Sequence, residues 1–202
     1  MKRIPVLPTA FVALAVAAMI ALGLWQLLIR LPAKEAYLAQ LAANPGKPPV
    51  AFPLRPDDTL LFRRSSVMCL SPVSIRLAGA GAAGFRAIAE CLTGAEGPGA
   101  AVQLGTTRDA NARPRWGGGL VRGYLAHAPD ARPLIAGLWD RTPERLLLVA
   151  ETPPPGLARN TPPDLDSVPN SHLAYAGQWF FFAAVAVVIY ALALRRRWAG
   201  RP

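Results

Sequence analysis

The chain has 202 residues, of which 52% are hydrophobic and 17% charged, and its formal net charge is +10. Most of this charge lies at the two ends: residues 1–30 carry three basic and no acidic side chains, and residues 173–202 carry four basic and no acidic ones. The segment between them holds 15 basic and 12 acidic side chains, a net of +3. A net charge this small gives a weak electrostatic field, which does not attract the phosphate groups of nucleic acid. Nucleic acid is therefore excluded as a partner.

Residues 6–29 form an apolar run that is long enough to cross a bilayer, which requires about 20 residues in a helix. A cleaved signal peptide is the alternative, since the chain starts with Lys2-Arg3 and Ala15-Val16-Ala17 is similar to a cleavage site. The apolar run continues well past that site, which favours a membrane helix. Small residues at a spacing of four in this run, Ala13, Ala17 and Ala21, indicate a face for close contact with another helix.

Gln26 is a polar residue within this apolar run. An unpaired amide in hydrocarbon costs several kcal/mol, so Gln26 requires a partner. Arg30 lies one α-helical turn further and is expected to face the same way, at the depth of residues 172–179. Two interpretations stay open: a polar site that both spans share, or Trp25 as an interfacial anchor with Arg30 reaching the lipid headgroups.

After residues 32–44, which have helical spacing, the chain carries a proline-rich linker at 45–56 and a second one at 152–169. Short segments between them, separated by glycine, proline and aspartate, are typical of strands. The predicted strands are 60–69, 73–77, 85–92, 101–106, 120–126 and 146–151. The fold class is therefore a membrane protein in which two transmembrane helices flank a mainly β (α+β) soluble domain, an antiparallel sheet or small barrel.

Cys69 and Cys91 both fall in this soluble domain. An oxidising compartment permits a disulfide between them, which we favour over two buried thiols that pack as small hydrophobic groups. Their spacing matches neither Cys-x-x-Cys nor a metal site. A thiol enzyme that uses both cysteines is a third class of function with little support.

Residues 173–194 form the second apolar run, and Arg195-Arg196-Arg197 follows it. Basic flanks on both spans predict a cytoplasmic N-terminus, residues 1–5, and a cytoplasmic C-terminus, residues 195–202. Residues 30–172 then lie outside the cytoplasm, in the periplasm if the chain belongs to a bacterial inner membrane.

His172 lies at the mouth of the second span, where ionisable side chains tend to be functional. Tyr175 and Trp179 follow at i+3 and i+7 and share its helix face. This face could stack on a flat macrocycle, or His172 could simply cap the helix. His127 has no second ligand near it in the sequence and is predicted to be a surface residue. No nucleophile elbow, phosphate loop or His-Glu-x-x-His motif is present, so the chain is not expected to be an enzyme.

Two runs carry a resemblance: Gly-x-Trp-Gln-Leu-x-x-Arg-x-x-x-Lys at 23–34 and Asn-x-His-x-x-Tyr-Ala-x-x-Trp-Phe at 170–180. Together with the two-span layout they resemble the surfeit locus protein 1 family, assembly factors for cytochrome c oxidase. The chain departs from the family pattern at Ser171, where a second asparagine is usual, and it lacks the usual Arg-Gly-Trp run. The departures are those of a divergent bacterial branch.

The resemblance implies a protein that helps haem a reach the catalytic subunit of the oxidase, with haem a synthase as a further partner. It implies that His172 contacts the haem iron, with Tyr175 and Trp179 beside it. The residues that the resemblance places opposite His172, at the end of the first span, are Trp25, Gln26 and Arg30. The alternative is a membrane scaffold that binds oxidase subunits and never binds haem.

Overall fold

The structure is a computed structural model that describes residues 4–94, 99–129, 139 and 142–199. The outermost residues of the two predicted cytoplasmic ends, including Lys2, Arg3 and Arg201, lie outside the described residues. The chain divides into two compact units. The helical unit comprises residues 1–38 and 168–202, and the β domain comprises residues 39–167.

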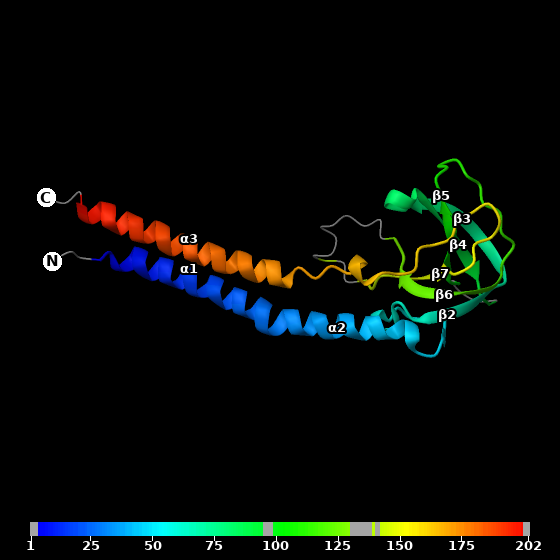
Figure 1. Cartoon of the computed structure of the whole chain (residues 1–202), viewed down its shortest axis with the longest axis horizontal. Helices are drawn as coiled ribbons and strands as arrows, with labels where there is room; N and C mark the ends of the chain where they lie inside the picture. The colour runs from blue at the N-terminus through cyan, green and yellow to red at the C-terminus, as the bar shows by residue number, and fades with distance from the viewer. Residues whose placement is uncertain (1–3, 95–98, 130–138, 140–141, 200–202) are drawn as a thin grey trace. The chain divides into compact units, whose positions relative to one another are not determined.

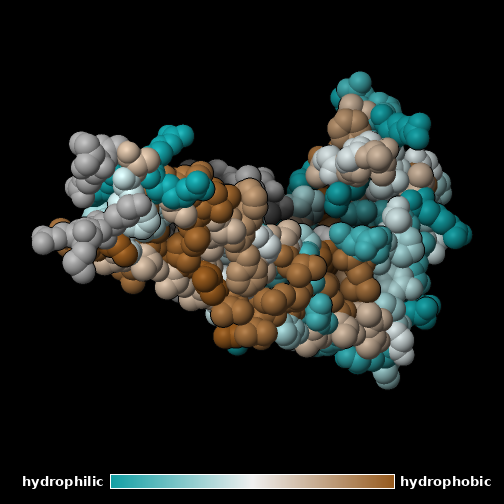
Figure 2. Space-filling view, turned by 60° about the vertical axis from the view of Figure 1, so that its left-hand side comes forward, coloured by the Kyte–Doolittle hydropathy of each residue, from teal (hydrophilic) through white to brown (hydrophobic). Residues whose placement is uncertain are grey.

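The helical unit is built from α1 (Val6–Trp25), a π-helical turn η1 (Gln26–Arg30), the first part of α2 (Leu31–Ala43), and α3 (His172–Ala199). α1 and α3 run side by side (Figure 1). Only 6% of the most apolar window of each long helix is buried, and large apolar side chains cover their outer faces, brown in Figure 2. The core helix of a soluble protein would be mostly buried, so these helices are suited to lipid. The predicted fold class is confirmed: this is a membrane protein with two spans that flank a β domain.

The two helices meet through small residues. Gly23 of α1 and Ala176 and Ala183 of α3 are buried. A Cβ atom added to Gly23 would lie 2.7 Å from the ring of Phe180, so the absence of a side chain lets the backbones approach closely. The predicted alanine face of α1 is wrong, because Ala13, Ala17 and Ala21 are all exposed. Spacing alone does not say which of several small faces meets the partner helix.

The β domain contains one seven-stranded sheet in the order β1-β2-β6-β7-β5-β4-β3. Neighbouring strands are antiparallel except for the pairs β1/β2 and β5/β7, which are parallel. The strands are β1 (Val50–Ala51), β2 (Arg64–Cys69), β3 (Ser71–Gly79), β4 (Phe85–Leu92), β5 (Ala101–Thr107), β6 (Gly119–His127) and β7 (Leu146–Ala150). Short 3₁₀ turns are η2 (Asn44–Gly46), η3 (Asp58–Leu60), η4 (Gly81–Ala83) and η6 (Leu165–Ser167).

All six predicted strands are present, and the sheet is mixed rather than purely antiparallel. The first predicted strand begins later than expected, at Arg64 instead of residue 60. The reason is local: Asp57 caps η3 by accepting a hydrogen bond from the Thr59 backbone N–H, and Phe62 has a left-handed φ of 65°. Neither conformation continues a strand. β1 was not predicted, because two residues in a proline-rich linker carry no alternation.

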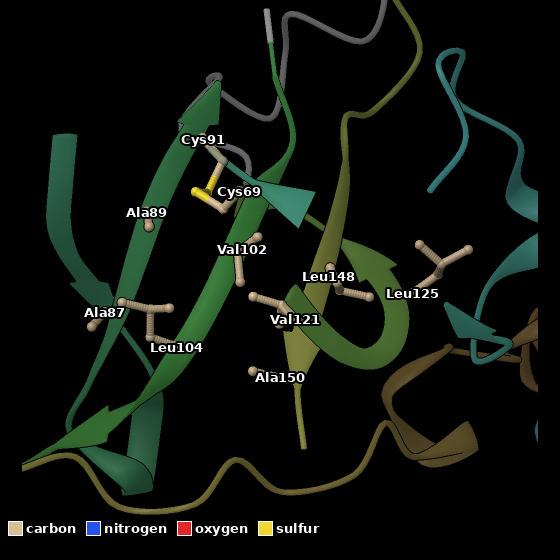
Figure 3. Close-up of a cluster of buried hydrophobic side chains, with 10 residues drawn as sticks. All are labelled: Cys69, Ala87, Ala89, Cys91, Val102, Leu104, Val121, Leu125, Leu148 and Ala150. Atoms are coloured by element: carbon tan, nitrogen blue, oxygen red, sulfur yellow. A yellow bond between two sulfur atoms is a disulfide. The ribbon is translucent and has the colours of Figure 1, made fainter. Parts of the chain in front are cut away.

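The sheet curls around an apolar core, and a disulfide joins β2 to β4, each of which is the second strand from one end of the sheet (Figure 3). A single residue, Leu70, separates β2 from β3, although these strands lie near opposite ends of the sheet order. Cys69 of β2 is bonded to Cys91 of β4, with their Cα atoms 5.2 Å apart, and both residues are at most 2% exposed. The cysteine pairing that the sequence favours is therefore the pairing in the structure.

Two asparagines fix irregular segments of the β domain, one to the turn before β2 and the other to β5. Asn44 is buried, and its side chain donates hydrogen bonds to the backbone oxygens of Thr59 (2.7 Å) and Leu61 (2.8 Å). Asn160, in the second proline-rich segment, exchanges hydrogen bonds with the side chain and backbone of Gln103 in β5. Because buried polar groups need such partners, each asparagine fixes the segment that carries it.

Candidate functional site

The polar residues predicted at the mouths of the two spans meet in the helical unit. His172 is the first residue of α3, and its Nδ1 atom lies 2.8 Å from Oε1 of Gln26 in the π-helical turn. Both side chains are half-buried. Of the two interpretations that the sequence left open, the structure therefore supports a polar site that both spans share. Gln26 finds its partner in His172, on the other helix.

The π-helical turn explains the neighbouring contact. Its hydrogen bond runs from the backbone N–H of Leu31 to the carbonyl of Gln26, five residues earlier. In a regular α-helix, residues five apart point about 140° away from each other. In this structure the guanidinium of Arg30 lies over the ring of Trp25, five residues before it, at 5.5 Å from the ring centroid. The wider turn thus brings an aromatic ring and a cation together beside Gln26.

Tyr175 and Trp179 lie one and two turns along α3 from His172, as predicted. Tyr175 is half exposed, and Trp179 meets Phe182 edge to face, with ring centroids 6.4 Å apart. In the part of the chain that the structure describes, neither residue hydrogen-bonds to the His172–Gln26 pair. The structure therefore assembles four of the six predicted residues into two direct pairs, and it places the other two on the adjoining surface of α3.

A second polar contact joins the spans and was not predicted. The hydroxyl groups of Thr9 in α1 and Tyr190 in α3 are hydrogen-bonded to each other. Thr9 is a polar residue that interrupts the first apolar run, as Gln26 does. The general rule that a polar residue within a span needs a partner, which was applied to Gln26, would have identified Thr9 as well.

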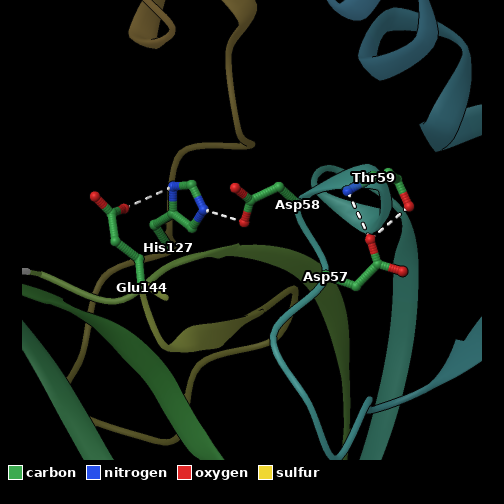
Figure 4. A network of polar contacts seen from close by, with 5 residues as sticks. All are labelled: Asp57, Asp58, Thr59, His127 and Glu144. Atoms are coloured by element: carbon green, nitrogen blue, oxygen red, sulfur yellow. Dashed lines mark hydrogen bonds and ion pairs between the residues drawn. The ribbon is translucent and has the colours of Figure 1, made fainter. Parts of the chain in front are cut away.

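His127 makes more contacts than expected. It ends β6, and its two ring nitrogens lie 2.9 Å from Asp58 and 3.0 Å from Glu144 (Figure 4). Next to this network, hydrogen bonds from the side chain and then the backbone of Thr59 lower the pKa of Asp57. Among the described residues, no group of three or more histidine, cysteine, aspartate or glutamate side chains is arranged to hold a metal ion.

These features define a two-span membrane protein with a disulfide-bonded β domain and a histidine–glutamine pair between its spans. Residues 13–184 match the model of the SURF1 family, so the chain belongs to this family and the resemblance predicted from the two sequence runs is confirmed. The family is linked to the assembly of cytochrome oxidase and is not a known class of enzyme. No curated protein and no solved structure matches the chain.

Proposed function

We propose that this protein helps haem a reach or settle in the catalytic subunit of an a-type cytochrome c oxidase, and that it holds the haem transiently at His172. The observation that carries the proposal is the position of His172. It begins the second span, and one ring nitrogen is bound to Gln26. Imidazole with one nitrogen bound in this way is the usual form of a haem or metal ligand.

The surrounding residues fit a haem. Binding requires an axial ligand, aromatic surface for the ring and cations for the propionates. Besides His172, the site offers the paired Trp25 and Arg30 and the exposed Tyr175. Trp179 extends the aromatic surface along α3. A single protein ligand gives a weaker hold than two, which suits transfer to another protein better than storage.

The proposal includes a topology and partners. The basic flanks of both spans support cytoplasmic termini, with the β domain on the other side, in the periplasm of a bacterium. The catalytic subunit of the oxidase receives the haem, and haem a synthase is the source from which it comes. The disulfide between Cys69 and Cys91 supports an oxidising compartment for the β domain.

The test compares visible spectra of the full-length chain purified in detergent from cells that make haem a. We expect a Soret band in the wild type that is lost in His172→Ala. The matched control is His127→Ala, since the chain has only two histidines and His127 is held by carboxylates in the β domain. A band that survives in His172→Ala would refute haem binding at this residue.

A scaffold that binds oxidase subunits without haem is the alternative, and the exposed apolar faces of α1 and α3 favour it as surfaces for other membrane helices. The same preparation separates the two functions. If the wild type copurifies with oxidase subunits and shows no Soret band, while deletion of the chain still abolishes oxidase assembly, the scaffold is correct.

A further inference from the structure

The side chain of Gln26 reaches His172 because of where α1 and α3 touch. Gln26 follows the buried Gly23 by three residues, which places both on the face of the first helix that meets α3. On α3, His172 precedes the buried Ala176 by four residues and so shares its face. The glycine and the alanine allow the close backbone approach, and the polar pair completes the same contact.

The π-helical turn begins at Gln26. Such turns are rare, and they occur frequently at functional sites. Here the turn keeps Gln26 directed at α3, and it carries Arg30 round to Trp25. Arg30 therefore does not compete for the amide of Gln26, and that amide is left for the histidine.

The contact between the two side chains has a chemical direction. An amide oxygen can only accept a hydrogen bond, so the Nδ1 atom of His172 donates to Oε1 of Gln26, and in a neutral imidazole this atom is the one that carries the ring proton. The Nε2 atom then keeps its lone pair, which is the electron pair that a haem iron binds. No side chain among the described residues hydrogen-bonds to Nε2.

We propose that Gln26 is a positioning residue: it holds His172 in the Nδ1–H tautomer and orients Nε2 for ligation. This inference rests on the proposed function for its ligation step, whereas its tautomer step concerns the protein without haem. Gln26 acts through His172 and does not itself need to touch the haem.

The first test uses the full-length, haem-free chain in detergent, labelled with ¹⁵N in histidine. The chain has two histidines, so the His127→Ala variant assigns the His172 signals. We expect Nδ1–H in the wild type, a shift towards Nε2–H in Gln26→Leu, and restored Nδ1–H in Gln26→Glu, which keeps an acceptor oxygen. The matched control is Gln178→Leu, because Gln178 is an exposed glutamine of α3. An unchanged His172 tautomer in Gln26→Leu overturns the inference.

The second test titrates the same variants with hemin and follows the Soret band. Loss of a residue that orients a ligating histidine typically weakens metal affinity about 10- to 100-fold, and we expect this loss in Gln26→Leu but neither in Gln26→Glu nor in Gln178→Leu. If Gln26→Leu changes the tautomer of His172 but leaves the hemin affinity unchanged, the positioning role is overturned. The third outcome is that the His172 tautomer changes in Gln26→Leu but the wild type does not bind hemin. This result overturns the proposed function and the ligation step, and it supports the Gln26–His172 hydrogen bond.

Discussion

The disulfide between Cys69 and Cys91 is expected to supply a large part of the stability of the β domain. It closes a loop with a sequence separation of 22. The loss of chain entropy in the unfolded state then amounts to about 3 kcal/mol at 25 °C. Replacing both residues by alanine keeps the buried sites apolar, and it should lower the free energy of unfolding by about this amount. Since urea slopes are typically about 1–3 kcal/mol per M, the midpoint should fall by about 1–3 M.

Pulse proteolysis of the full-length chain across a urea series in detergent measures this midpoint for the β domain, because the spans stay in the micelle. Reduction of the wild type should lower the midpoint similarly, and reductant should leave the double variant unchanged. A midpoint that moves by less than a few tenths of a molar in both experiments would show that the curled sheet holds β2 and β4 together without the bond.

Three further changes test packing, a buried hydrogen bond and a titrating group. Gly23→Ala should destabilise the helical unit by about 1–3 kcal/mol in a thermal melt, because its Cβ would press on the Phe180 ring, whereas Gly177→Ala, which meets open space, should stabilise it by up to about 1 kcal/mol. Asn44→Ala should cost the β domain about 1–3 kcal/mol in urea unfolding, since the buried carbonyl of Leu61 loses its donor, whereas the Thr59 carbonyl keeps the side chain of Gln40. The lowered pKa of Asp57 stabilises the fold above the ordinary value of 3.8, and this contribution is lost as the pH falls through the lowered pKa, so Asp57→Asn should flatten the acid limb of stability against pH. Equal slopes in the variant and the wild type would refute this assignment.

Most of the strands could be predicted because their signals are local. Glycine, proline and aspartate separate segments of apolar and β-branched residues, as at β4, whose bounds match the prediction. The order of the strands is not a local property. β7 lies between β5 and β6 and runs parallel to β5, although β6 separates them in sequence. All five residues of β7 are buried, which fits a central strand but does not specify its neighbours.

The candidate site was predictable in its members and only partly in its geometry. Gln26 and His172 stand out because each is polar at the edge of an apolar run. The expectation that Gln26 shares a direction with Arg30 assumed a regular α-helix. The π-helical turn instead couples Arg30 to Trp25, and no residue type in this segment signals such a turn. The cross-helix partner of Gln26 likewise depends on the contact at Gly23, which spacing alone did not identify.

The hydrogen bond between Gln26 and His172 is expected to contribute little to the stability of the helical unit. Hydrogen bonds between membrane helices contribute only about 0.6 kcal/mol on average, whereas either side chain left alone in an apolar setting carries a penalty of several kcal/mol. Two apolar residues would remove that risk and pack as well. The double variant Gln26→Leu/His172→Leu should therefore leave the melting temperature of the helical unit nearly unchanged while it abolishes hemin binding. Such a separation between stability and chemistry is the pattern expected of a pair retained for its lone pair of electrons at Nε2 rather than for the fold.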